Sequence, residues 1–357
     1  MLLMKPKRWR AVIYIAHMNF AYLAVARKAD LYQWLTLRLV KQELAQDVGW
    51  NALDGVRWTP WGTVLFAEEI AGGRLFEVTL NDDKMFAALV KERLEVGRLA
   101  HEGIDLDSDG NVYVVDEHRG RSIGCTAVDP VIVPCGGSVY KFIPNNYGDS
   151  SSGDLYILKV TGPDGTGQGE WVGPIDTSNA RMSGAEFSGQ SYQRPKDLEI
   201  IDDTLYVAVT EGPRDENGKE HYGGRALAVN LDTMQVLNFV KAGVNVPIEI
   251  GKPGQEGFQT GFDSIDNLAE APDGRLIMIE DNKPSDIWFA STRKVNKYGT
   301  SKDVNLFSSL TDPSAEGTGI YFSPTDPKTL YVNVQHSTAE DGDGTWTITK
   351  TSTKDND

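Results

Sequence analysis

Four short apolar strands predicted in this sequence end in acidic residues, and a fifth ends in histidine. They read TPWGTVLFAEE at residues 59–69, SDGNVYVVDE at 108–117, DDTLYVAVTE at 202–211, PDGRLIMIED at 272–281 and PKTLYVNVQH at 327–336. Carboxylate oxygens are ligands for hard cations such as Ca²⁺, Mg²⁺ and Mn²⁺. A repeat that brings such groups to equivalent places predicts one shared metal site.

A second recurring segment precedes each acidic strand end. These segments are NALDGVRW at 51–58, HEGIDLD at 101–107, RPKDLEI at 194–200, SIDNLAEA at 264–271 and EGTGIYFS at 316–323. The expected metal ligands from both sets are Glu68, Glu69, Glu102, Asp197, Glu211, Asp266, Asp281 and Glu316, and Asp116 and Glu117 belong to the wider acidic set.

Two further considerations restrict this set. Adjacent strand residues point to opposite faces, so only one acid of each pair can face the shared site. A site assembled from several segments is loose, which favours calcium over smaller cations. Some of these acids are also expected to cap turns or to pair with Lys and Arg on the rim.

Three residues are candidates for catalysis. Arg194 opens its segment where others carry Glu102, Ser264 or Glu316, and a cation beside a metal cluster suits an anionic substrate. Metal ions plus Arg194 would favour phosphoryl chemistry, although Arg194 could instead pair with a neighbouring carboxylate. His336 takes the place of an acid at the fifth strand end. Lys196, two residues after Arg194, could help to bind phosphate.

The elements that must position these groups recur in a fixed order. Each cycle has a lead-in strand, an apolar strand and a third strand usually announced by glycine, which predicts an all-β fold, a β-propeller over residues 49–350. Five repeats are clear. The gap between His101 and Arg194 is nearly twice the usual spacing, and DLYILKV (154–160) and GEWVGPI (169–175) within it could form an extra blade. Six blades are therefore predicted, with five as the alternative.

Composition restricts the partners. The 357-residue chain has a formal charge of −16, which argues against binding nucleic acid or an anionic membrane, because such binding relies on a basic face. We expect a small-molecule substrate and a monomeric protein.

The ends of the chain are expected to lie outside the propeller. Residues 1–26 have the basic start, short apolar run and small residues of a signal peptide, which predicts a periplasmic or secreted protein. Residues 27–48 are expected to form a helical lead-in. The alternative for the signal peptide is an amphipathic helix in a cytoplasmic protein that continues through residues 31–47. Residues 351–357 are expected to be a disordered tail. In an exported protein Cys125 and Cys135 could form a disulfide; in the cytoplasm they would be free thiols.

One motif is close to an EF-hand loop. Asp105, Asp107 and Asp109 have the spacing of calcium ligands, but the residues that follow alternate like a strand. A β-turn is the expected structure, and a peripheral calcium ion is the alternative.

These segments together resemble the PhoX-type alkaline phosphatases. TPWGTVLFAEE is similar to that family's TPWGTWLTCEE, RPKDLEI to its RPED segment, SIDNLAEAPDGRL to its PDNL segment and EGTGIYFSPTDPKTLYVNVQH to its ECTGPCFSPDGRTLFVNIQHPG, in the same order over residues 51–336. The resemblance implies a β-propeller, export, and phosphate-ester hydrolysis by a calcium and iron cluster. It makes Glu68, Glu69, Glu102, Asp197, Asp266 and Glu316 metal ligands or their supports, and Arg194 the phosphate clamp.

This sequence departs from the family pattern at three places. The cysteine before the paired acids is Ala67, the acidic third residue of RPED is Lys196, and Lys7-Arg8 is not a twin-arginine export pair. Without the thiolate and the carboxylate, calcium is expected and iron is doubtful. The outcomes left open are a calcium-only phosphatase, an enzyme of altered ester preference and a relative without catalysis.

Two other function classes fit the same pattern. A calcium-dependent lactonase or arylesterase of the gluconolactonase and paraoxonase type would need a base near the cation, for which His101 or His336 with Asp266 and Asn267 could serve. A non-catalytic binding propeller would use the acids structurally.

Overall fold

The computed structural model describes most of the predicted propeller. Side chains are described for residues 50–81, 87–120, 136–162, 164–210, 224–251, 256–283, 285–310, 312, 314–339 and 342–350, and the backbone also for 15–16 and 20–21. The predictions for the signal peptide, the helical lead-in, the tail, Cys125, Cys135 and Glu211 rest mainly or wholly on residues outside these ranges. Among the described residues, no helix is long and apolar enough to span a membrane.

Short antiparallel strands make up nearly all of the described fold. The first blade consists of β3 (Leu53–Trp58), β4 (Thr63–Glu68), β5 (Leu75–Leu80) and β6 (Ala87–Glu92). A second series comprises β7 (His101–Leu106), β8 (Val112–Asp116), β9 (Val139–Pro144), β10 (Gly153–Val160) and β11 (Gly167–Val172). The third blade comprises β12 (Pro195–Ile201), β13 (Thr204–Val209), β14 (Arg225–Asn230) and β15 (Gln235–Lys241).

Two further blades and a few short elements complete the described structure. The fourth blade comprises β16 (Ile265–Glu270), β17 (Leu276–Glu280), β18 (Asp286–Ala290) and β19 (Val304–Ser309), and the last comprises β20 (Glu316–Phe322), β21 (Thr329–Gln335) and β22 (Gly344–Thr349). The short elements are β1 (Ile15–Ala16), β2 (Phe20–Ala21), the 3₁₀ turns η1 (Leu94–Val96) and η2 (Thr177–Asn179), and α2 (Ala180–Glu186).

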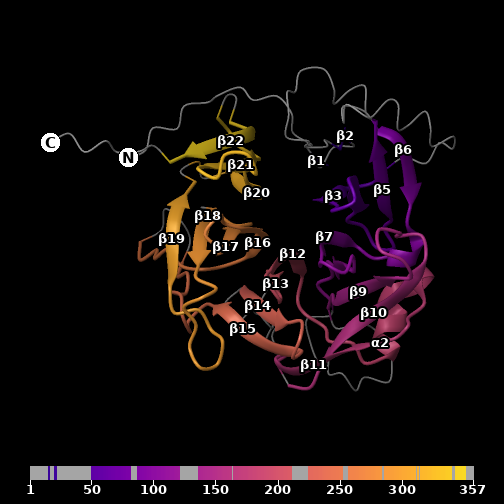
Figure 1. Cartoon of the computed structure of the whole chain (residues 1–357). Coiled ribbons are helices and arrows are strands. Elements are labelled where there is room, and N and C mark those ends of the chain that lie inside the picture. The colour runs from indigo at the N-terminus through magenta and orange to yellow at the C-terminus, as the bar shows by residue number, and fades with distance from the viewer. Residues whose placement is uncertain are drawn as a thin grey trace.

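The blades are arranged around a common axis (Figure 1). Their first strands, β3, β7, β12, β16 and β20, lie nearest the axis, and successive first strands contact one another. The all-β propeller prediction is therefore confirmed. This arrangement brings the starts of five separate segments together at the axis, as a shared site requires.

The apolar core lies between neighbouring blades. In β8, Val114 packs with the first blade, whereas the adjacent Val115 packs with the third. Likewise, in β17 Met278 faces the third blade and Ile279 faces the last. The second strand of each of these blades is covered on both faces, and a strand covered in this way is apolar at every position rather than at alternate ones. This explains runs such as VYVV and LIMI.

Every first strand carries a β-bulge near its start. The register with the second strand shifts at Gly55, Glu102–Gly103, Lys196–Asp197, Asp266 and Gly319. Gly55 has φ +54, and a Cβ there would lie 1.7 Å from a backbone oxygen of the next first strand. A bulge bends the strand and redirects its side chains, so the acid-bearing segments turn at equivalent points.

The two segments proposed for an extra blade do not form one. β10 pairs with β9 over five residue pairs, from Gly153 with Pro144 to Ile157 with Tyr140, and β11 pairs with β10. They are thus the outer strands of the second blade. β11 also pairs with β15, so β7–β15 form one nine-stranded sheet. Five blades are present in the described residues, and a sixth stays a prediction.

Candidate metal centre

Three second strands end in a pair of acids, and the two acids of each pair have opposite surroundings, as strand alternation predicts. Glu68 is 1% exposed, and its carboxylate accepts hydrogen bonds from Nε and Nη2 of Arg74 at 2.8 and 2.6 Å. It also accepts from the backbone N–H of Asn51 at 3.1 Å. Glu68 is therefore held by protein donors, away from the axis.

The first acids of two other pairs make the same type of contact. Asp116 accepts from the backbone N–H of Ala100 at 2.9 Å and pairs with Arg181 of α2 at 2.6 Å. Glu280 accepts from the backbone N–H of Asp263 at 3.0 Å and from the indole of Trp288 at 2.8 Å. These buried carboxylates fix the backbone just before the first strands β3, β7 and β16.

The second acids are held by a different recurring bond and turn toward the axis. The backbone N–H of Glu69 donates to Ala52 at 2.7 Å, and that of Glu117 donates to Ala100 at 2.7 Å. The N–H of Asp281 donates to Ser264 at 2.8 Å. Each strand end is thereby tied to the start of its own first strand.

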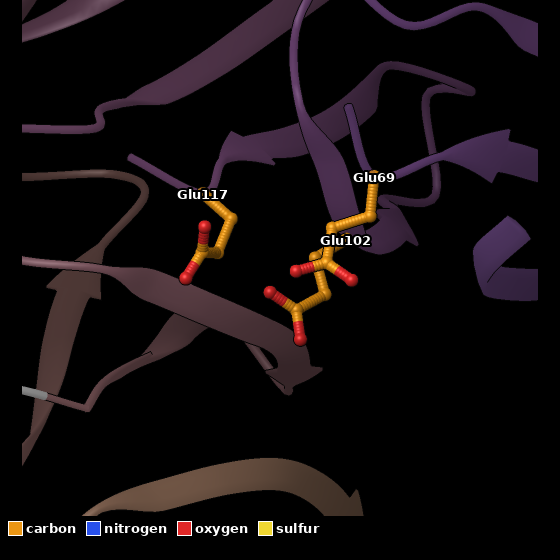
Figure 2. A group of neighbouring side chains, drawn as sticks. All are labelled: Glu69, Glu102 and Glu117. Carbon is orange, nitrogen blue, oxygen red and sulfur yellow. The ribbon is translucent and has the colours of Figure 1, made fainter. Parts of the chain in front are cut away.

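Two groups of carboxylates result. The first group is Glu69, Glu102 and Glu117, whose side chains turn toward one another in Figure 2, and the second is Asp266, Asp281 and Glu316. In each group, one oxygen of every member lies within 4.8 Å of the others. Glu102 is 3% exposed, and its Oε2 has no hydrogen-bond partner among the described residues.

Two positively charged side chains from one segment of the chain lie between the two carboxylate groups. Arg194 hydrogen-bonds through Nε to Glu117 of the first group, and its Nη2 lies 3.9 Å from Oδ2 of Asp281 in the second. Lys196 lies 2.8 Å from Oε1 of Glu102 and 3.2 Å from Oδ1 of Asp266.

Burial and mutual repulsion make these acids hard to ionise. Burial, followed by the negative charge of Asp54, raises the pKa of Glu69 from 4.5 to about 8. Burial and Glu316 raise the pKa of Asp281 from 3.8 to about 6. Burial also raises the pKa of Glu102 well above its ordinary value, although the charge of Lys196 opposes this shift. A divalent cation would relieve this repulsion and displace protons.

The donor set fits a hard divalent cation. All six members of the two groups are carboxylates, and the unpartnered Oε2 of Glu102 is a buried oxygen that a cation would satisfy. Ala67 lies buried in β4 and offers no ligand atom where the resembling family has a cysteine. The arrangement provides no soft ligand for iron at that position.

Other predicted site residues have different surroundings. Asp197 accepts hydrogen bonds from the backbone N–H groups of Leu198 and Leu268, both at 2.8 Å, and thus connects two blades. His336 lies at the second group, with Nε2 3.9 Å from Oε2 of Glu316 and a side chain that is 55% exposed. Asp197 is therefore bound to the backbone of two blades, and the His336 side chain is accessible to solvent.

His101, one of the two histidines proposed for a lactonase, belongs to neither carboxylate group. His101 is fully buried, and its Nε2 lies 2.9 Å from the carbonyl oxygen of Gly97. Burial lowers the pKa of His101 to about 4. His101 is therefore unsuited to act as a base beside a cation at the axis, which leaves His336 for that alternative.

The segment similar to an EF-hand loop is a turn. Asp107 accepts from the backbone N–H groups of Asp109 and Asn111 at 3.0 and 2.9 Å and from the Tyr113 hydroxyl at 2.9 Å. Asp105 pairs instead with Arg57 at 2.6 Å. These contacts are those of the expected β-turn.

The main difference from the predicted ligand set is the exchange of Glu68 for Glu117. Both belong to acidic pairs, and the structure brings Glu117, not Glu68, to the axis. The signal was present in the sequence, because Glu69, Glu117 and Asp281 are all the second acid of their pair.

Comparison with known proteins identifies one family. The family described as alkaline phosphatase PhoX matches residues 73–338. The structure of Pseudomonas fluorescens PhoX in complex with vanadate, a transition-state analogue, is 19% identical in sequence, with a TM-score of 0.57, over 85% of this chain and 70% of that one.

Two further solved structures match with lower TM-scores. The PQQ-bound aldose sugar dehydrogenase of Streptomyces coelicolor is 14% identical, with a TM-score of 0.38, over 84% of this chain and 95% of that one. A gluconolactonase of Xanthomonas campestris is 13% identical, with a TM-score of 0.31, over 83% of this chain and 85% of that one. No curated protein matches this sequence.

Proposed function

Because this chain belongs to the alkaline phosphatase PhoX family, we propose that it hydrolyses phosphate monoesters at the carboxylate cluster on the propeller axis. The observation that supports this most directly is the pairing of two three-carboxylate groups with the guanidinium of Arg194 between them. Cations and a guanidinium that converge on one place are suited to the negative charge of a phosphoryl group.

We propose calcium as the cation, held by Glu69, Glu102 and Glu117 in one site and by Asp266, Asp281 and Glu316 in the other. When bound, calcium would neutralise phosphoryl oxygens and polarise the bond to phosphorus. Arg194, which lies between the groups, would bind a non-bridging oxygen. His336, half exposed beside Glu316, would donate a proton to the leaving alkoxide. Water supplies the oxygen that forms the new bond to phosphorus and releases a proton that replaces the one given by His336. The bond from phosphorus to the ester oxygen breaks, and that oxygen leaves as an alcohol.

Metal restoration tests this function. The purified chain is stripped with a chelator, and p-nitrophenyl phosphate hydrolysis is followed at alkaline pH while calcium and then iron are added back. We expect recovery with calcium alone, since the donor set consists of carboxylates. No turnover with any of these metals would refute the phosphatase proposal and favour the lactonase or the binding propeller.

Arg194→Ala provides the residue-level test. Removing a preorganised donor to the developing charge typically lowers kcat by about 10²-fold or more. The matched control is Arg293→Ala, because Arg293 is exposed and its loss changes the net charge by the same amount. Equal activity of the two variants would exclude Arg194 from phosphate binding.

A further inference from the structure

Lys196 is a buried cation between the two carboxylate groups. It lies at the start of β12 and is 6% exposed. Its Nζ is 2.8 Å from Oε1 of Glu102 in the first group and 3.2 Å from Oδ1 of Asp266 in the second. The ammonium group therefore occupies the position at which the two groups approach each other.

Lys196 is paired with one carboxylate of each group in this position. An ammonium group is a compact point charge with three donors, so one ammonium can contact both Glu102 and Asp266. Lys196 is therefore a counter-ion that the chain itself supplies to the cluster.

The two oxygens of Glu102 consequently have different surroundings. Oε1 accepts a hydrogen bond from Lys196, whereas the buried Oε2 has no hydrogen-bond partner among the described residues. The Glu102 side chain is also a member of the first carboxylate group. An unsatisfied oxygen in a side chain that is 3% exposed is unfavourable unless a cation or a proton satisfies it. Oε2 is thus the oxygen of Glu102 that is left for an added cation in the first group.

The net charge of the two groups indicates how many divalent cations the centre can hold. The six carboxylates of the two groups, when ionised, carry −6, and Arg194 and Lys196 reduce this to −4. Two divalent cations would balance this charge of −4, and if Asp54 nearby is counted as well, one negative charge is left. A third divalent cation between Glu102 and Asp266 would have to displace Lys196 or lie against its positive charge.

We propose that Lys196 acts as a built-in cation that keeps the centre as two separate one-ion sites and excludes a third divalent cation from between Glu102 and Asp266. The inference rests on the cation sites proposed above, but not on phosphatase activity. It assigns Lys196 to the centre itself and makes it a positioning residue for Glu102 and Asp266. A lysine reserved for phosphate would not be committed to these carboxylates.

Calcium stoichiometry of the chelator-stripped full chain tests the proposal. Isothermal titration calorimetry and elemental analysis should give two calcium ions for the wild type and three for Lys196→Met, because two buried carboxylates then face each other without a counter-ion. Lys196→Arg, which keeps the charge, should bind two. The matched control is Lys294→Met, which removes an exposed lysine paired with Asp303 and should also leave two.

The affinities provide a second readout. Removing a positive charge this close to the sites should tighten calcium binding by about tenfold or more in Lys196→Met, whereas Lys294→Met should leave it unchanged. Circular dichroism establishes which variants fold. If Lys196→Met does not fold, Lys196→Gln replaces it, and the wild-type stoichiometry decides if neither folds.

The outcomes separate the two proposals. A third ion on the wild type, or an unchanged count and affinity in a folded Lys196→Met, would overturn the role of Lys196. No calcium binding by the wild type would overturn the cation sites as well. Two bound ions without hydrolysis of p-nitrophenyl phosphate would count against the phosphatase function only.

Discussion

Glu68 and Glu69 are adjacent in sequence but have opposite surroundings, and replacing each with glutamine should separate their roles. Glu68 is almost fully buried, and Arg74 satisfies its carboxylate through two guanidinium hydrogen bonds. Glu69 faces Glu102 and Glu117 at the axis. We expect Glu68 to contribute to folding, and Glu69 to oppose folding until a cation binds.

The structure gives a magnitude for each change. Breaking a buried ion pair by neutralising one partner costs about 3–5 kcal/mol, so Glu68→Gln should lower the free energy of unfolding by that amount. For Glu69, a pKa raised from 4.5 to about 8 corresponds to roughly 5 kcal/mol between the protonated and ionised forms. Glu69 costs the folded chain nothing below pH 4.5, where its carboxyl group is protonated in both the folded and the unfolded state. It destabilises the folded chain increasingly as the pH rises through 8. Glu69→Gln should therefore stabilise the calcium-free chain at pH 9, by up to about 5 kcal/mol, and change little at pH 4.5.

Urea unfolding of the chelator-stripped proteins at pH 9 and pH 4.5 measures both effects, and calcium titration complements it. Glu69→Gln should weaken calcium binding by about tenfold or more, because affinity follows the number of charged ligands. Glu68→Gln should bind calcium as the wild type does once it is folded. A Glu68→Gln variant of full stability, or a Glu69→Gln variant that is less stable at pH 9 yet binds calcium normally, would refute the assignment.

Three further substitutions test residues outside the two carboxylate groups. Arg57→Met removes a cation 2.6 Å from Asp105 and 3.0 Å from Glu199, and urea unfolding should show a loss of about 3 kcal/mol because both acids are nearly buried. Gly55→Ala would place a Cβ 1.7 Å from a backbone oxygen of the next first strand, so differential scanning fluorimetry should show a lower Tm, and an unchanged Tm would contradict this close approach. Burial raises the pKa of Glu249 from 4.5 to about 7. Glu249 therefore costs the folded chain nothing below pH 4.5 and destabilises it as the pH rises through 7. Glu249→Gln should thus have a higher Tm than the wild type at pH 8 but not at pH 4.5.

The repeated sequence pattern was sufficient to predict the second strands of the blades. β4 and β17 lie within the predicted segments 59–69 and 272–281, because a strand buried on both faces requires an apolar run bounded by turn residues. The place of β10 could not be predicted in this way. Its pattern suits an inner strand of an extra blade and an outer strand equally, and only its pairing with β9 decides between them.

The candidate site was predictable in kind but not in each member. Alternation predicts that one acid of every pair faces inward, yet the pattern alone does not show which. The predicted set includes Glu68 and omits Glu117, and only contacts such as that of Glu68 with Arg74, just before β5, show that the second acid of each pair is the inward one. The contact of Lys196 with Glu102 joins positions 94 residues apart, so no local signal could reveal it.

The nine-stranded sheet has a consequence for cooperativity. β11 and β15 pair across what would otherwise be a boundary between blades, so the second and third blades share backbone hydrogen bonds as well as side-chain packing. Amides in such a sheet are expected to exchange with solvent as one cooperative unit, whereas units joined by packing alone can open separately. Glu102 and Lys196 both lie in this unit. The contact between Glu102 and Lys196 should therefore persist when the other blades open locally. The part of the centre that contains Asp281 and Glu316 would then open while this contact stays in place.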